Sequence, residues 1–60
     1  VRAELAHALS VALGSLAEVD ALLQIALDLR YLSEETHQHL VALRDEASRV
    51  TFGLQRSIRR

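Results

Sequence analysis

The sequence lacks cysteine, proline and lysine, and its 60 residues include only two aromatic residues, Tyr31 and Phe52. Without cysteine, no disulfide can stabilise this short chain, and nothing marks its redox compartment. Without proline, and with glycine only at Gly14 and Gly53, long uninterrupted helices are favoured. The scarcity of aromatic residues leaves leucine, valine and alanine to form the apolar core.

The apolar content is high for so short a chain. Half of the residues are apolar, whereas a chain of this length buries only about 60% of the surface that its unfolded form exposes. Two helices alone are too few to cover that much apolar surface. We therefore expect a partner, which is either a further segment of the same polypeptide or other copies of this chain.

Neither a membrane span nor a signal peptide is predicted. The longest apolar stretch, residues 21–29, is interrupted by Gln24 and Asp28 and is far shorter than the roughly 20 apolar residues that cross a bilayer. No basic segment precedes an apolar core, as it would in a signal peptide. We expect a cytoplasmic protein that does not associate with a membrane.

The first half of the chain carries an apolar heptad repeat. Its spacing alternates between four and three residues, which keeps one side of a helix facing a partner; its members are Leu5, Leu9, Ala12, Leu16, Val19, Leu23 and Ala26. A second apolar stripe lies beside it, is broken by Ser15 and Glu18, and consists of Ala8, Val11, Leu22, Ile25, Leu29 and Leu32. Such a wide apolar face is typical of a bundle helix with two neighbours, and we predict a helix over residues 2–30.

Gly14 and Ser15 allow two interpretations of this helix. Residues 15–18 fit the capping-box pattern, so a second helix could start at Ser15. Alternatively, the helix is continuous, and the two small residues permit a neighbouring helix to approach closely. Because the heptad repeat passes through Gly14 without a change of phase, we predict the continuous helix.

A turn is predicted at residues 31–33. Ser33 is a preferred N-cap residue, and Glu34 and Glu35 follow where the helix dipole favours negative charge. The second helix, predicted over residues 34–58, has its own apolar repeat of Leu40, Leu43, Ala47, Val50 and Leu54. Because the connection is short, the two helices should pack antiparallel.

Together these patterns predict an all-α fold. Residues 1–60 should form a single unit, an antiparallel helical hairpin that is half of an up-down four-helix bundle. The residues that we expect to pack within the bundle or oligomer are Leu5, Leu9, Leu16, Val19, Leu23, Leu40, Leu43, Val50 and Leu54.

Basic residues gather near the end of the chain. No acidic residue follows Glu46, whereas Arg49, Arg56, Arg59 and Arg60 do. Repeated in an oligomer, these arginines would raise the local positive potential and contact the phosphates of RNA or DNA. They equally complement the negative end of the helix dipole, which requires no ligand.

Catalysis, a cofactor and a metal site are not expected. His37 and His39 are two residues apart and point in different directions on a helix, and His7 belongs to the other helix. No glycine-rich phosphate loop is present. Glu34 and Glu35 are explained by helix capping.

Several short motifs of this sequence occur in the same order as in a known protein family. Gly14 to Asp20 reads GSLAEVD, Tyr31 to Glu35 reads YLSEE, and Phe52-Gly53-Leu54 precedes a basic end. These segments resemble the third and fourth helices of the bacterial four-helix-bundle proteins encoded by intervening sequences of 23S ribosomal RNA genes. The accessory variability proteins of retroelements belong to the same family. Arg30 is a departure, because the family commonly has glycine there.

The resemblance covers only the C-terminal half of the family domain. It implies a bacterial, non-enzymatic bundle, often assembled as a ring of five copies, in which some relatives bind nucleic acid or a reverse transcriptase. It also implies that the first two helices come from the same polypeptide or from another chain. The alternative is a purely structural oligomerisation module with no role in nucleic-acid binding.

Overall fold

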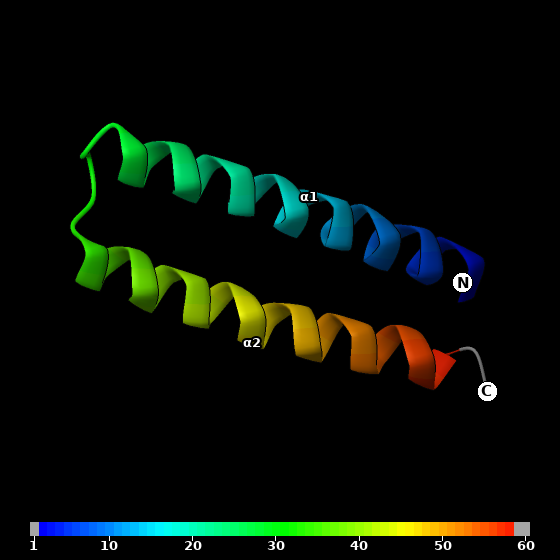
Figure 1. Cartoon of the computed structure of the whole chain (residues 1–60). Helices are drawn as coiled ribbons and strands as arrows, with labels where there is room; N and C mark the ends of the chain where they lie inside the picture. The colour runs from blue at the N-terminus through cyan, green and yellow to red at the C-terminus, as the bar shows by residue number, and fades with distance from the viewer. Residues whose placement is uncertain (1, 59–60) are drawn as a thin grey trace.

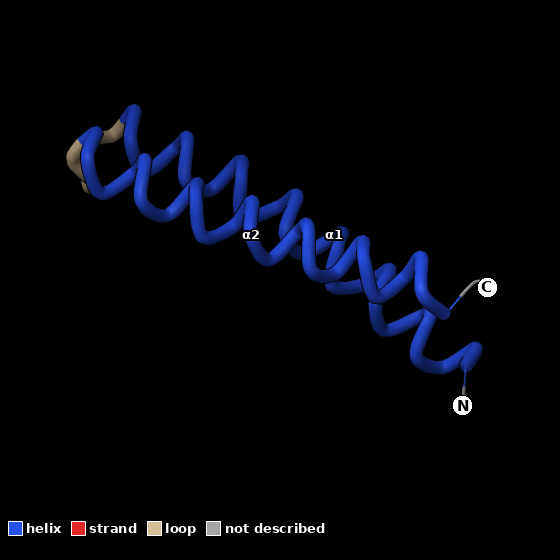
Figure 2. Tube along the Cα trace, turned by 90° about the horizontal axis from the view of Figure 1, so that it is seen from below, coloured by secondary structure: helices blue, strands red, loops and turns tan. Residues whose placement is uncertain are grey.

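The computed structural model describes residues 2–58, which form two helices, α1 (Arg2–Asp28) and α2 (Glu34–Ile58). The helices lie side by side and run antiparallel, so the start of α1 and the end of α2 are at the same end of the hairpin (Figure 1). Viewed after a quarter turn, they remain paired along their length (Figure 2). The hairpin is a rod that measures 42 × 15 × 11 Å. The prediction of an all-helical hairpin is confirmed.

Helix α1 is continuous through Gly14 and Ser15. It extends over 27 residues, most of which are alanine, leucine and other good helix formers. A single glycine costs about 1 kcal/mol relative to alanine, which the surrounding turns of helix tolerate. The predicted continuous helix is confirmed, and no second helix starts at Ser15.

Helix α1 ends two residues earlier than predicted, in a Schellman motif. The amide N–H of Arg30 donates to the carbonyl of Leu27 at 3.0 Å, and that of Tyr31 donates to the carbonyl of Ala26 at 2.8 Å. This pair of bonds requires a left-handed backbone at the residue just past the helix, where glycine is the usual choice. Arg30 occupies that position with φ of 64°. The motif, rather than the apolar pattern, sets the end of the helix.

Helix α2 starts at the predicted N-cap. The hydroxyl of Ser33 accepts a hydrogen bond from the amide N–H of Thr36 at 3.1 Å and donates one to the Thr36 hydroxyl at 3.0 Å. The carbonyl of Ser33 accepts the first helical bond, from the N–H of His37, at 2.9 Å. These contacts satisfy donors that a bare helix start would leave unpaired.

The two helices meet along one heptad track each, and these tracks differ in polarity. The half-buried or buried residues on the inner side of α1 are mainly Ala6, Leu9, Leu13, Leu16, Leu23 and Leu27. The half-buried track of α2 is mostly polar and consists of His37, Val41, Arg44, Ser48, Thr51, Gln55 and Ile58. Gln55 marks the pairing near the open end, where its side-chain amide donates to the hydroxyl of Ser10 at 3.3 Å. Among the described apolar residues only Leu9 is buried, and it is still 9% exposed.

Helix α1 is long and apolar enough to cross a membrane, judged by length and composition. The expectation of no membrane span counted only uninterrupted apolar residues, whereas α1 meets the criterion over a longer window that includes a few charges. Core helices of water-soluble proteins and signal sequences meet the same criterion. Because this criterion depends on length and composition alone, it agrees with a helix that carries apolar residues on more than one side.

Replacing Arg30 with glycine should stabilise the hairpin. Glycine adopts the left-handed conformation without the steric cost that an L side chain carries there, which is about 1–2 kcal/mol. Part of this gain is lost to the greater freedom of glycine in the unfolded chain. We expect Arg30→Gly to raise the free energy of unfolding by about 1 kcal/mol, measured by urea denaturation followed by circular dichroism.

The neighbouring residue provides the control. Tyr31 has no left-handed backbone, so Tyr31→Gly should lower the stability through chain entropy alone. Equal effects of the two substitutions would contradict the assignment of Arg30 to the left-handed position.

Candidate functional site

The apolar repeat of α2 does not pack against α1. Leu43 is 62% exposed, Val50 59% and Leu54 53%, whereas Leu40 is half-buried. The contact with α1 uses the polar track that lies beside this repeat. The leucine-rich stripe of α2 is therefore left facing outward.

Many apolar residues that remain exposed or half-buried lie on one side of the hairpin, whereas Val11, Ile25 and Phe52, which are also exposed, occupy other heptad positions. Leu5, Ala12, Val19 and Ala26 each precede an inward-facing position of α1 by one residue, and Leu40, Ala47 and Leu54 stand in the same relation to the inner track of α2. In an antiparallel pair, which is related by a two-fold axis normal to its plane, equivalent heptad positions lie on the same side. We call this side the apolar face; it comprises Leu5, Ala8, Ala12, Val19, Leu22 and Ala26 of α1 and Leu40, Leu43, Ala47, Val50 and Leu54 of α2.

The structure divides the predicted packing residues into two groups. Leu9, Leu16 and Leu23 contribute to the contact between the helices, as their burial shows. The others lie on the apolar face, with Leu40 half-buried and the rest exposed: Leu5, Val19, Leu40, Leu43, Val50 and Leu54. The hairpin alone therefore covers only part of the predicted packing surface.

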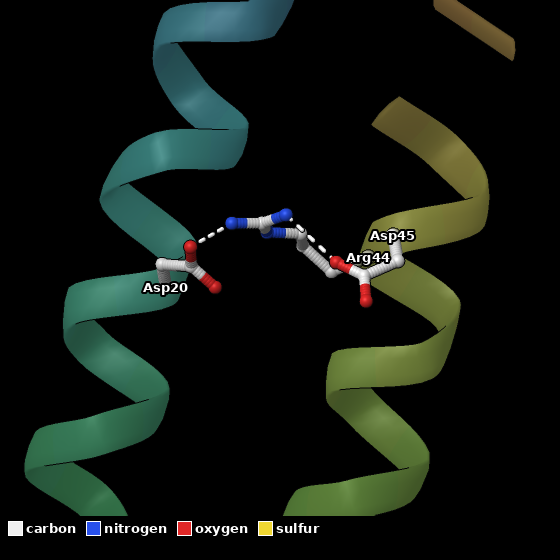
Figure 3. A network of polar contacts seen from close by, with 3 residues as sticks. All are labelled: Asp20, Arg44 and Asp45. Carbon is white, nitrogen blue, oxygen red and sulfur yellow. Dashed lines mark hydrogen bonds and ion pairs between the residues drawn. The ribbon is translucent and has the colours of Figure 1, made fainter. Parts of the chain in front are cut away.

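Arg44 links the helices through a polar network that sequence patterns did not indicate (Figure 3). Its guanidinium forms an ion pair with Asp20 of α1, and its Nη1 donates to Asp45 Oδ1 at 2.8 Å. The Nε of Arg44 is buried and has no hydrogen-bond partner within residues 2–58. Because Asp20 and Asp45 are about half exposed, the network contributes little to stability, roughly 0–1 kcal/mol for such a pair. Its main effect is to set the pairing of the helices.

The predicted nucleic-acid-binding residues are only partly described. Arg49 and Arg56 are exposed on α2, and their separation of seven residues places them on the same side, about 10 Å apart along the helix. Neither forms an ion pair within residues 2–58, and residues 47–58 contain no acidic side chain. Arg59 and Arg60 lie outside the described residues.

No group of histidine and acidic residues suited to a metal ion occurs within the described part of the chain. His37 is half-buried on the side that meets α1, whereas His39 is exposed, so the two rings point apart as predicted. A shallow hollow of about 330 Å³ is lined by His39, Ala42, Leu43 and Glu46. All four residues belong to α2, so the hollow is a feature of one helix surface.

Comparison with known proteins gave no relative: no protein-family model, no characterised protein and no solved structure matches this chain.

Gly14 is not required for the contact between α1 and α2. A Cβ atom added to Gly14 would meet no atom within 4 Å, and its place in the heptad is outside the apolar face. Gly14→Ala should therefore raise the free energy of unfolding by about 0.5–1 kcal/mol, because alanine is the better helix former. Thermal unfolding followed by circular dichroism measures this change.

Gly53, which also has open space around it, is the matched control. It lies near the end of α2, where helix propensity matters less, so Gly53→Ala should give a smaller gain. Destabilisation by Gly14→Ala alone would instead mean that another helix approaches Gly14 closely.

Proposed function

We propose that this protein is a non-enzymatic scaffold whose hairpin forms half of an oligomeric four-helix bundle. The observation that carries this proposal is the apolar face, which holds leucine and valine side chains of both helices in contact with water. An exposed apolar surface of this extent is uncommon on a monomeric soluble protein and marks an interaction site. Complete burial of a fully exposed side chain of this kind contributes about 1.5–3 kcal/mol, and these partly covered side chains would each contribute a fraction of that.

The width of the apolar region on each helix supports a bundle rather than a simple pair. In a four-helix bundle every helix contacts two neighbours, so its apolar stripe lies between the two lines of contact. In this hairpin, α1 and α2 contact one another along one edge of their stripes and leave the other edge free. Two further helices that packed against this free edge would complete a four-helix bundle.

The motif resemblance to 23S rRNA intervening-sequence proteins agrees with this proposal and adds to it. It suggests a bacterial cytoplasmic protein whose copies assemble in a ring of five, with the remaining helices supplied by the same polypeptide or by another chain. The same resemblance gives no reason to expect catalysis or a bound cofactor.

A single charge on the apolar face should separate the oligomer. We expect wild-type protein to show concentration-dependent association in sedimentation equilibrium. Leu43→Asp should weaken that association by about a hundredfold. The leucine would be buried only in the oligomer, and the carboxylate that replaces it would have to lose its hydration there.

Ala42→Asp is the matched control, since Ala42 is the preceding residue, is exposed and lies outside the apolar face. It should leave the association within about threefold of wild type. A wild-type protein that is helical and monomeric at high concentration would overturn the proposal of a scaffold.

Binding of RNA or DNA through Arg49 and Arg56 is a second candidate function. It is favoured by the absence of acidic residues in the second half of α2, next to two exposed arginines without ion pairs in the described structure. Oligomerisation would repeat this cationic segment and strengthen its attraction for phosphates. Because no aromatic residue accompanies the arginines, such binding would show little sequence preference.

Charge reversal tests this function. The double variant Arg49→Glu/Arg56→Glu should abolish binding of labelled RNA and DNA in fluorescence anisotropy at low salt. The double variant Arg49→Lys/Arg56→Lys keeps both charges and should retain binding. The affinity of the wild-type protein for nucleic acid should fall steeply as the salt concentration rises. If the wild-type protein binds neither RNA nor DNA at low salt, nucleic-acid binding is excluded and the purely structural module is the remaining function.

A further inference from the structure

We infer that the second half of the bundle is another copy of this chain, related by a two-fold axis perpendicular to the helices. In this dimer the two turns lie at opposite ends, so that α1 packs beside the partner's α1 and α2 beside the partner's α2. The inference rests on the proposed scaffold function and specifies its partner, with a dimer in place of the ring of five that the motif resemblance suggests. It is carried by the order of residues along the apolar face.

On α2, the apolar residues of the apolar face have nearly the same spacing before and after Ala47. Leu40 and Leu54 are each seven residues from Ala47, while Leu43 and Val50 are four and three residues away. The polar residues Thr36 and Ser57 close the pattern at its two ends. A two-fold axis near Ala47 would therefore bring Leu40 of one copy to Leu54 of the other and Leu43 to Val50. Such self-complementarity is what an isologous interface requires.

On α1, the same operation pairs large residues with small ones. About a centre at Ser15, Leu22 is matched by Ala8, Val19 by Ala12 and Leu5 by Ala26, each within one residue of perfect symmetry. Large side chains would thus enter the space above small ones on the partner's helix. This alternation lets facing helices interdigitate at the density of a protein interior.

One axis serves both helices. The contacts Asp20–Arg44 and Ser10–Gln55 fix the level of α1 against α2 and place Ser15 beside residues 49–50. The centre on α2, Ala47, is two to three residues from that level, or about 3–4 Å at 1.5 Å per residue. An axis midway between the two centres shifts the pairs on each helix by two to three residues, about 3–4 Å, which is less than one helical turn, so the two helices of one hairpin can face the two helices of its copy together.

The exposed area of the hairpin matches what such a dimer would bury. Its accessible surface is 4791 Å², whereas a folded monomer of 6.7 kDa is expected to expose about 3,900 Å². The excess of about 900 Å² per chain is close to the roughly 800 Å² that each partner contributes to a stable interface. A single second copy is therefore sufficient to cover the excess surface.

Spin-label distances test the symmetry, because the chain has no native cysteine. Ala47→Cys places a label beside the proposed axis, and Tyr31→Cys places one at the turn. In the inferred dimer the distance between the two labels at position 47 is short, comparable with the spacing of about 10 Å between adjacent helix axes lengthened by the label arms. The distance between the two labels at position 31 is close to the 42 Å length of the hairpin.

Sedimentation equilibrium of each labelled variant gives the mass beside the distance, and circular dichroism confirms helicity. Ala42→Cys is the matched control; its side chain points away from the apolar face, so its label distance should exceed that at position 47. If Ala47→Cys changes the mass, a mixture of Leu43→Cys and Val50→Cys proteins tests the same axis, since these two residues should form a mixed disulfide on oxidation.

The outcomes separate the inference from the proposed function. A dimer with close labels at position 47 and distant labels at position 31 supports both. An oligomer in which the turns lie close together, or one with five copies, overturns the two-fold dimer and leaves the scaffold function. A protein that stays monomeric at all concentrations overturns both, and the apolar face would then belong to a different chain or segment.

Discussion

A pair of helices shares only one line of contact, and in this chain the apolar surface of each helix is wider than that line. This constraint governs the structure. α1 covers part of its apolar surface against α2, yet eleven large apolar side chains remain exposed within the described residues. Among the residues that the structure describes, only Leu9 is buried, so burial inside the hairpin offsets little of the conformational entropy of ordering it. Covering the apolar face would supply the burial that the hairpin alone lacks.

The polar track of α2 is a consequence of the same constraint. If the leucines of α2 faced α1, the hairpin would bury them but would leave no edge for further helices. Instead, small and polar residues such as Ser48 and Thr51 meet α1, and Arg44 reaches across to Asp20. A slip of α2 by one turn would separate this ion pair and the contact between Gln55 and Ser10. Polar contacts of this kind add little energy but restrict the pairing of helices.

Much of the fold could be predicted from the sequence because its signals are local. The heptad repeat predicted both helices, and the hydroxyl of Ser33 predicted the start of α2, since a cap depends only on its own turn of helix. The predicted end of α1 was two residues too late. The left-handed position just past the helix usually holds glycine, and here it holds Arg30, which gives no such signal in the sequence. Periodicity carries no information about a left-handed residue, which the hydrogen bonds of the motif reveal.

The contact side of α2 could not be predicted, because it depends on tertiary pairing. The repeat through Leu43, Val50 and Leu54 identifies an apolar stripe but not which neighbour covers it. Arg44 and Asp20 are far apart in the sequence and belong to no motif, so their pairing required the structure. The arginines beyond Glu46 form a charge pattern that the sequence shows, whereas the structure was needed to see that Arg49 and Arg56 form no ion pair within residues 2–58.

The well-defined turn also has a kinetic consequence. Residues 26–37 contain the hydrogen bonds that end one helix and start the next, so the reversal of the chain closes only a short loop, at small entropic cost. Pairing of the helices can then advance outward from the turn, and the contact between Ser10 and Gln55, 45 residues apart, forms among the last. The end opposite the turn should open first and exchange its amide hydrogens fastest. Arg56 lies at that end, in the part of the hairpin with the lowest expected local stability.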